Sequence, residues 1–293
     1  MINDEAEIEA SRAPLLDHLI ELRSRLIISL IAVFIGFCVC FYFADPIFKF
    51  LIHPFEIANG LFSAQRSNGA KHGPFDLILA LINQTPTTGG NQLRLIYTAA
   101  LELFFAKLKV AGFGALIAAF PIIAWQLYRF IAPGLYRRER YTVLPFLVAS
   151  PVLFTIGAAL VYYVMLPFVL WFSLSQQIST GGVTVELTPK VDEYLSLVTT
   201  LVLAFGLCFQ LPVVLTLAGL AGLISSKALR SGRRYAILGI AVVAAIVTPP
   251  DPISMLMLAG PIVLLYEISI WCVWLIERRR KKEDEDADLA VIN

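Results

Sequence analysis

The 293-residue sequence has few charged residues and few histidines. Charged residues make up 15% of the chain, hydrophobic residues make up 58%, and the mean hydropathy is +0.76. Soluble domains are about one quarter charged and about half apolar. The only histidines are His18, His53 and His72, and none of them lies inside a long apolar run. This composition predicts a polytopic membrane protein and excludes an ordinary soluble domain.

The sequence also lacks the motifs of several enzyme and pump classes. It has no HExxH, no phosphate-binding GxxxxGK[ST] and no GxSxG, which argues against a metalloprotease, an ATP-driven pump and a serine hydrolase. The four cysteines lie in apolar segments without CxxC spacing, so we expect no disulfide and no metal site. No nucleophile and base can be named, which leaves an intramembrane enzyme as a distant third hypothesis. We therefore predict a protein that is not an enzyme and that has no cofactor, and the net charge of +1 gives no indication of a nucleic-acid partner.

The sequence is rich in long apolar runs without charged residues. The first, Leu26–Ala44, would extend about 28 Å as a helix, close to the thickness of a hydrocarbon core. Backbone groups in lipid need partners within their own segment, so such runs form helices. We predict an all-α membrane protein with six transmembrane helices, formed by Leu26–Ala44, Val110–Leu127, Val143–Phe172, Tyr194–Leu223, Tyr235–Val247 and Ile253–Ile276.

The fifth of these runs is the shortest. Tyr235–Val247 would reach only about 20 Å, so crossing requires local thinning of the bilayer. The alternative is a re-entrant hairpin over residues 235–276 with the TPPDP sequence at its tip. We favour a true crossing, and both arrangements return the chain to the same side.

The distribution of lysine and arginine predicts the orientation. If the N-terminus is cytoplasmic, the cytoplasmic segments hold 16 of the 23 basic residues, and most of the others lie in one long loop that counts less. We therefore predict that both termini are cytoplasmic. We divide the chain into a cytoplasmic segment with an interfacial amphipathic helix (1–25), a six-helix transmembrane domain (26–276) with a long outside loop (46–103), and a disordered charged tail (277–293).

Two polar clusters flank the apolar runs. Glu21 precedes Arg25 by four residues, the favourable order for an ion pair on a helix, and Glu139 lies in the basic sequence LYRRER. From the residues alone, a surface ion pair with arginine anchors explains the first cluster. Gln210 and Glu267 are the deep polar residues, and they would serve the competing hypothesis of a secondary carrier or channel for a small solute or ion.

Four segments together carry a family resemblance. HLIELRSRL (18–26), FIAPGLYRRER (130–140), FGLCFQLPV (205–213) and TPPDP (248–252) resemble TatC, the multispanning receptor subunit of the twin-arginine protein translocase. The resemblance implies a concave bundle of six tilted helices in the bacterial inner membrane. It also implies export of folded proteins, driven by the proton-motive force, in an oligomeric complex with single-span TatA/TatB-type subunits and membrane lipid.

The resemblance also implies roles for single residues. Glu21, Arg23, Phe130 and Glu139 match positions that bind twin-arginine signal peptides, and Pro54, Gln210 and Asp251 match positions that serve partner contact or translocation. The family often has Glu at the position of Gln210, so we expect hydrogen bonding to a partner helix there instead of proton transfer. A carboxylate can meet the planar fork of a guanidinium with two charge-assisted hydrogen bonds, which lysine cannot copy. The arginines that surround Glu139 should repel an incoming pair of arginines.

Overall fold

The computed structural model describes residues 2–68, 95–131, 140–180, 183–185, 188–248 and 252–292. Within these ranges the chain is helical apart from one short hairpin and the connections. The elements are α1 (Ile2–Tyr42), α2 (Ala44–Asn68), α4 (Glu102–Ile131), α5 (Arg140–Leu160), the π-helix η2 (Val161–Met165), α6 (Leu166–Ser175), β1 (Ile178–Thr180), β2 (Val183–Val185), α7 (Val191–Cys208), α8 (Leu211–Leu220), α9 (Ser226–Ser231), α10 (Arg233–Val247) and α11 (Pro252–Ile292).

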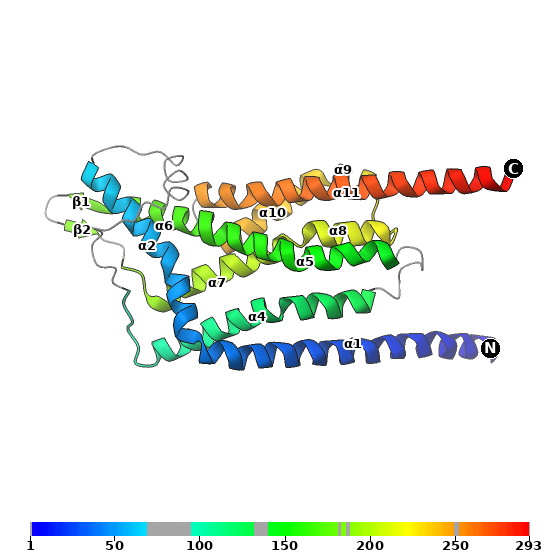
Figure 1. Cartoon of the computed structure of the whole chain (residues 1–293), viewed down its shortest axis with the longest axis horizontal. Helices are drawn as coiled ribbons and strands as arrows, with labels where there is room; N and C mark the ends of the chain where they lie inside the picture. Colours follow the sequence, from blue (N-terminus) through cyan, green and yellow to red (C-terminus); the bar gives the residue numbers. More distant parts are fainter. Residues whose placement is uncertain are drawn as a thin grey trace.

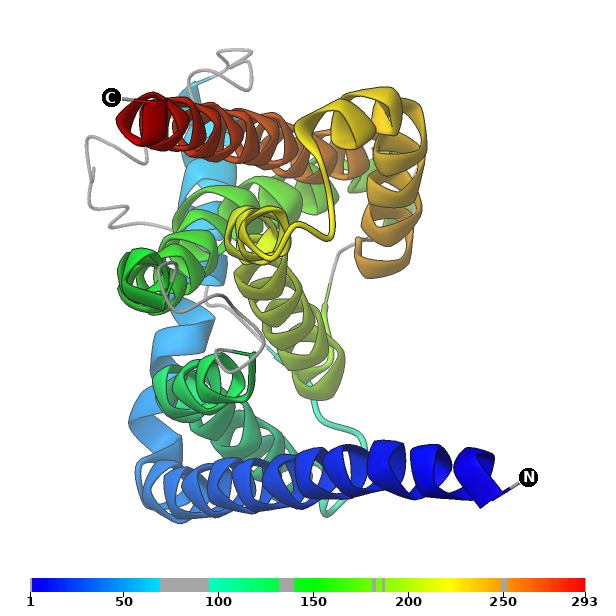
Figure 2. The same cartoon turned by 90° about the vertical axis from the view of Figure 1, so that its right-hand side faces the viewer.

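The long helices run side by side along the longest axis of the molecule. Both ends of the chain lie at the same end of this bundle, while α2 and the β1–β2 hairpin lie at the opposite end (Figure 1). The hairpin is antiparallel, with Ser179 opposite Thr184. In the end view, α1 and α4 form one edge of the bundle, and α10 and α11 lie at the far edge (Figure 2).

Five helical segments in the described ranges are long and apolar enough to cross a membrane. They are Leu19–Tyr42, Glu102–Phe130, Val148–Ser175, Val191–Leu220 and Pro252–Arg279. Each contains most of one apolar run that the sequence singled out, so the all-helical membrane architecture is confirmed. The fifth predicted run forms α10, which has 15 residues and a length of about 22 Å. By length and composition α10 is not among the five segments.

Two segments differ from the expected organisation. We treated residues 46–103 as a loop, but α2 occupies residues 44–68. We expected disorder from residue 277, but α11 continues as a helix to Ile292. The expected surface helix in PFDLILALIN (74–83) lies outside the described residues. The helix α1 runs without interruption from Ile2 to Tyr42, across the predicted membrane boundary at residue 25.

The core lies around α7. Fully buried side chains come from α2, α4, η2, α6, α7 and α11, and they include Leu51, Met165, Leu195, Phe205 and Ile262. In contrast, only 6% of the apolar window of α1 is buried, and its neighbour is mainly α4. Exposed apolar surface on that scale is typical of a helix that faces lipid.

Two glycines let aromatic rings pass between α5 and α7–α8. A Cβ atom on Gly206 would lie 2.5 Å from the Phe154 ring, and one on Gly157 would lie 2.7 Å from the Phe209 ring. No side chain fits at such distances without movement of the ring, so both positions require glycine for this packing. These two ring contacts hold α5 against the end of α7. The helix then breaks at Phe209–Gln210, and α8 follows with Pro212 in its first turn.

The other end of α8 has a Schellman motif. Gly222 has a φ of +70°, the Leu223 amide donates to the Ala218 carbonyl at 2.9 Å, and the Gly222 amide donates to the Gly219 carbonyl at 3.0 Å. A positive φ is inexpensive for glycine and strained for other residues. The chain therefore turns sharply here into α9, whose first turn is capped by the Ser225 hydroxyl.

Candidate functional site

A polar chain joins α1 to α4. The Arg25 guanidinium donates from Nη2 to Glu21 Oε1 at 3.1 Å and from Nη1 to Gln126 Oε1 at 3.4 Å. Glu21 and Arg25 lie one helical turn apart on the face of α1 that packs against α4, and Gln126 is buried near the end of α4. The predicted Glu21–Arg25 ion pair is therefore present, and it lies in a seam between two helices instead of on an open surface.

The other residues predicted for this site have different settings. Arg23 is exposed, and among the residues that the structure describes it forms no ion pair. Phe130 lies one turn beyond Gln126 on α4 and is partly buried. Glu139 lies outside the described residues. The structure thus brings Glu21 to the last turns of α4, near Phe130 along that helix.

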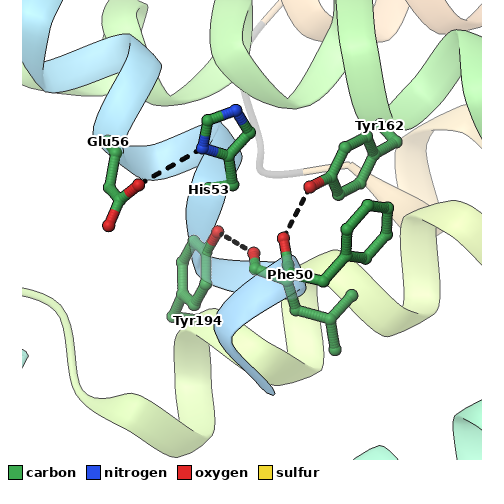
Figure 3. A network of polar contacts seen from close by, with 6 residues as sticks. Phe50, His53, Glu56, Tyr162 and Tyr194 are labelled. Atoms are coloured by element: carbon green, nitrogen blue, oxygen red, sulfur yellow. Dashed lines mark hydrogen bonds and ion pairs between the residues drawn. The ribbon is translucent and has the colours of Figure 1, made fainter. Parts of the chain in front are cut away.

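Pro54 lies inside α2 and is buried. Proline has no amide hydrogen, so the carbonyl four residues earlier, that of Phe50, loses its donor within the helix. Tyr162 in η2 fills this place, because its hydroxyl donates to the Phe50 carbonyl at 2.5 Å. The Tyr194 hydroxyl of α7 donates to the next carbonyl, that of Leu51, at 2.6 Å. Figure 3 shows both tyrosines pointing at the same turn of α2.

The ring contacts reinforce this junction. The Phe50 and Tyr162 rings stack with centroids 4.3 Å apart and an interplanar angle of 5°. His53 and Glu56 form an exposed pair at 3.2 Å on the same helix (Figure 3). A buried carbonyl without a donor destabilises a fold by about 1–3 kcal/mol. Tyr162 removes that penalty at the Phe50 carbonyl, and the two tyrosines together anchor the turn of α2 around Pro54 to η2 and α7.

Gln210 pairs within the chain. Its side-chain oxygen accepts from the Ser150 hydroxyl at 2.6 Å, and its amide donates to the Ser150 carbonyl at 2.9 Å. Ser150 belongs to α5 and is buried. We expected Gln210 to bond a partner helix, but in this structure both polar atoms of its side chain are engaged by α5. The Ser150–Gln210 pair holds α5 against the α7–α8 junction, next to the Gly206 and Gly157 ring contacts.

Two acidic residues of α11, Glu267 and Glu277, lie toward the other edge of the bundle (Figure 2). Glu267 of α11 pairs with Arg233 of α10 at 2.7 Å, and both side chains are partly exposed. Glu277 accepts from the Ser226 amide at 2.9 Å and also from the Ser226 hydroxyl, so it holds α9 against α11. Asp251 lies outside the described residues. Gln210 and Glu267, the two deep polar residues of the sequence, thus both have partners within the chain.

Comparison with known proteins identifies the family. Residues 17–261 match the family model described as Sec-independent protein translocase protein (TatC). The chain belongs to the TatC family. A TatC protein of Magnetococcus marinus is 43% identical over 273 residues, which cover 93% of this chain and 88% of that protein. A TatC protein of Aquifex aeolicus is 35% identical over 271 residues, which cover 92% of this chain and 98% of that protein.

Solved structures agree with the fold. A crystal structure of the twin arginine translocase receptor TatC matches with a TM-score of 0.65 at 35% identity, covering 88% of this chain and 98% of that one. A second crystal structure of the same receptor, in DDM, matches with a TM-score of 0.68 over 87% of this chain. The chain is therefore a multi-span membrane protein of a protein translocase family, and the predicted role in protein transport is confirmed.

Sequence reasoning missed the partners of the named residues. Gln126, Ser150, Tyr162 and Tyr194 all bond to predicted site residues or to the turn around one of them. Each contact joins residues at least 60 positions apart, beyond the reach of a local pattern. A buried glutamine and two tyrosines in otherwise apolar runs were the available signal, because buried polar groups normally have partners.

Proposed function

We propose that this chain is the receptor of a twin-arginine translocase and captures the signal peptides of folded cargo with Glu21 and Glu139. The observation that supports the proposal best is the state of Glu21. Its carboxylate uses one oxygen for Arg25, and the other oxygen has no partner among the described residues. A carboxylate with spare acceptor capacity, at the mouth of a seam between two helices, can accept an incoming guanidinium.

The proposal includes a topology. Both termini are cytoplasmic, α10 crosses as the short fifth of six spans, and the membrane is the bacterial inner membrane. The excess of basic residues in the segments assigned to the cytoplasm supports this orientation, as does the position of both chain ends at one end of the bundle (Figure 1). The α1–α4 seam then opens toward the cytoplasm, where cargo first arrives.

The proposal also includes partners and an energy source. Single-span TatA/TatB-type subunits join this chain in an oligomeric complex, and the proton-motive force drives transport. Asp251 and the joint around Pro54 lie toward the outer side in this topology, where they serve contact with those partners. Gln210 acts within the chain, by holding α7–α8 against α5 through Ser150.

Peptide binding to the full chain in nanodiscs tests the site. The probe is a fluorescent signal peptide with an Arg-Arg pair and an apolar segment, compared with its Lys-Lys counterpart. Glu21→Gln and Glu139→Gln should each weaken binding of the Arg-Arg peptide by about tenfold, the loss expected for one partly shielded charge-assisted bond. Glu193→Gln is the matched control, because Glu193 is exposed in the first turn of α7 at the opposite end of the bundle. Unchanged binding in both Glu21→Gln and Glu139→Gln would refute the proposed site.

A further inference from the structure

We infer that Arg25 is an internal ligand of Glu21, and that it sets the affinity for signal peptides because the incoming arginine must displace it. This inference rests on the proposed function. It adds Arg25 to the site and states the direction of its effect: Arg25 lowers the affinity for the signal peptide. The first observation is that the structure already contains the kind of contact proposed for the ligand, a guanidinium on the Glu21 carboxylate at 3.1 Å.

The geometry shows why the two guanidinium groups compete. A bidentate fork needs both carboxylate oxygens, and Arg25 holds Oε1. An incoming arginine limited to Oε2 would make a single hydrogen bond beside a like charge. Full engagement of Glu21 therefore requires Arg25 to leave.

The contacts of Arg25 indicate that it can leave at low cost. Its Nε atom is buried without a partner among the described residues, and its bond to Gln126 is long at 3.4 Å. Both features are those of a side chain stretched between two acceptors. Once released from Glu21, Arg25 can close on Gln126, so its charge keeps an acceptor inside the seam.

Partial burial sets the size of the effect. The Arg25 and Glu21 side chains are 21% and 33% exposed, so their pair is stronger than a fully exposed helix pair and weaker than a buried one. Removing this competitor should tighten peptide binding by about two- to tenfold. Because a lysine ammonium can bond to the free Oε2 without displacing Arg25, the gain should be larger for the Arg-Arg peptide than for the Lys-Lys peptide.

Two variants of the full chain in nanodiscs test this inference, because they should change peptide affinity in opposite directions. Arg25→Gln should tighten binding of the labelled Arg-Arg peptide by about two- to tenfold. Gln126→Met leaves both charges in place but removes the second acceptor, so displaced Arg25 has no partner and binding should weaken by a few-fold. In the double variant, Gln126→Met should have no further effect, because Arg25 is already absent.

The control separates competition from net charge. Arg129→Gln removes the same charge from an exposed position near the end of α4, and it should leave affinity nearly unchanged. Weaker binding in Arg25→Gln, or an equal gain in Arg129→Gln, would overturn the inference while leaving Glu21 as the receptor carboxylate. If Glu21→Gln alone does not weaken binding, this inference fails, and if Glu139→Gln does not weaken binding either, the proposed function fails with it.

Discussion

The tyrosine joint around Pro54 yields a quantitative prediction. Tyr162→Phe removes one hydroxyl and keeps the ring that stacks on Phe50 at 4.3 Å. The change therefore deletes the hydrogen bond to the Phe50 carbonyl with little loss of packing. In the native chain that carbonyl has no helical donor, because residue 54 is proline.

The magnitude follows from what the carbonyl loses. A net hydrogen bond contributes about 1 kcal/mol, and an unsatisfied buried carbonyl costs about 1–3 kcal/mol. Tyr162→Phe should lower the free energy of unfolding by about 1–2 kcal/mol. In a Pro54→Ala background, the new amide at position 54 can donate to the Phe50 carbonyl, so the same change should cost about 1 kcal/mol less.

The assay is unfolding in mixed detergent micelles, with the four proteins of this double-mutant cycle measured side by side. Tyr163→Phe is the control, because Tyr163 is the next residue in η2, is exposed, and donates no hydrogen bond among the described residues. An equal cost of Tyr162→Phe in both backgrounds would show that the hydroxyl does not replace the missing amide. A comparable cost for Tyr163→Phe would show that the loss is general to tyrosine in this helix.

Two further predictions concern the crossing of α5 with α7 and α8. Gly206→Ala should lower the free energy of unfolding by about 1–3 kcal/mol, because its Cβ would meet the Phe154 ring, whereas Gly239→Ala, with open space around its Cβ, should not destabilise the protein; equal midpoints in thermal unfolding would contradict this. Ser150→Ala should cost about 1–2 kcal/mol by leaving the Gln210 side chain without its hydroxyl donor, and the cost should shrink in a Gln210→Met background. Additive costs in that pair would argue against a direct bond.

The sequence was sufficient to predict the spans. Hydrocarbon thickness sets the length of an apolar run, and that rule needs no knowledge of neighbouring helices. Five predicted runs therefore coincide with long helices in the structure. The same rule left the short run Tyr235–Val247 ambiguous between a full crossing and a re-entrant hairpin, because α10 has only 15 residues.

The helix α2 could not be predicted from hydropathy. It contains Pro54 and ends in polar residues, and both features are more typical of a loop. Its helical form depends on packing against α4 and α6 and on hydroxyl donors from η2 and α7. The two hydroxyl donors, Tyr162 and Tyr194, follow more than one hundred residues after the carbonyls that they bond.

The candidate site was predictable only within single helices. The Glu21–Arg25 pair followed from i, i+4 spacing, which is local. The bonds of Arg25 to Gln126 and of Gln210 to Ser150 depend on which helices pack together, which local spacing does not encode. For Gln210, the family resemblance indicated the functional position but not the residue beside it. It therefore suggested a bond to another helix and did not point to Ser150 of α5.

The sparse burial of α1 has a consequence for biogenesis. This helix is synthesised before α4 and gains its main neighbour only when residues 102–131 have been made. Its stability in the bilayer during that interval must come from lipid contact alone, which its nearly unburied apolar surface provides. Docking of α4 then adds Gln126 beside Arg25, so the polar seam between α1 and α4 forms only after the α1 span is already inserted.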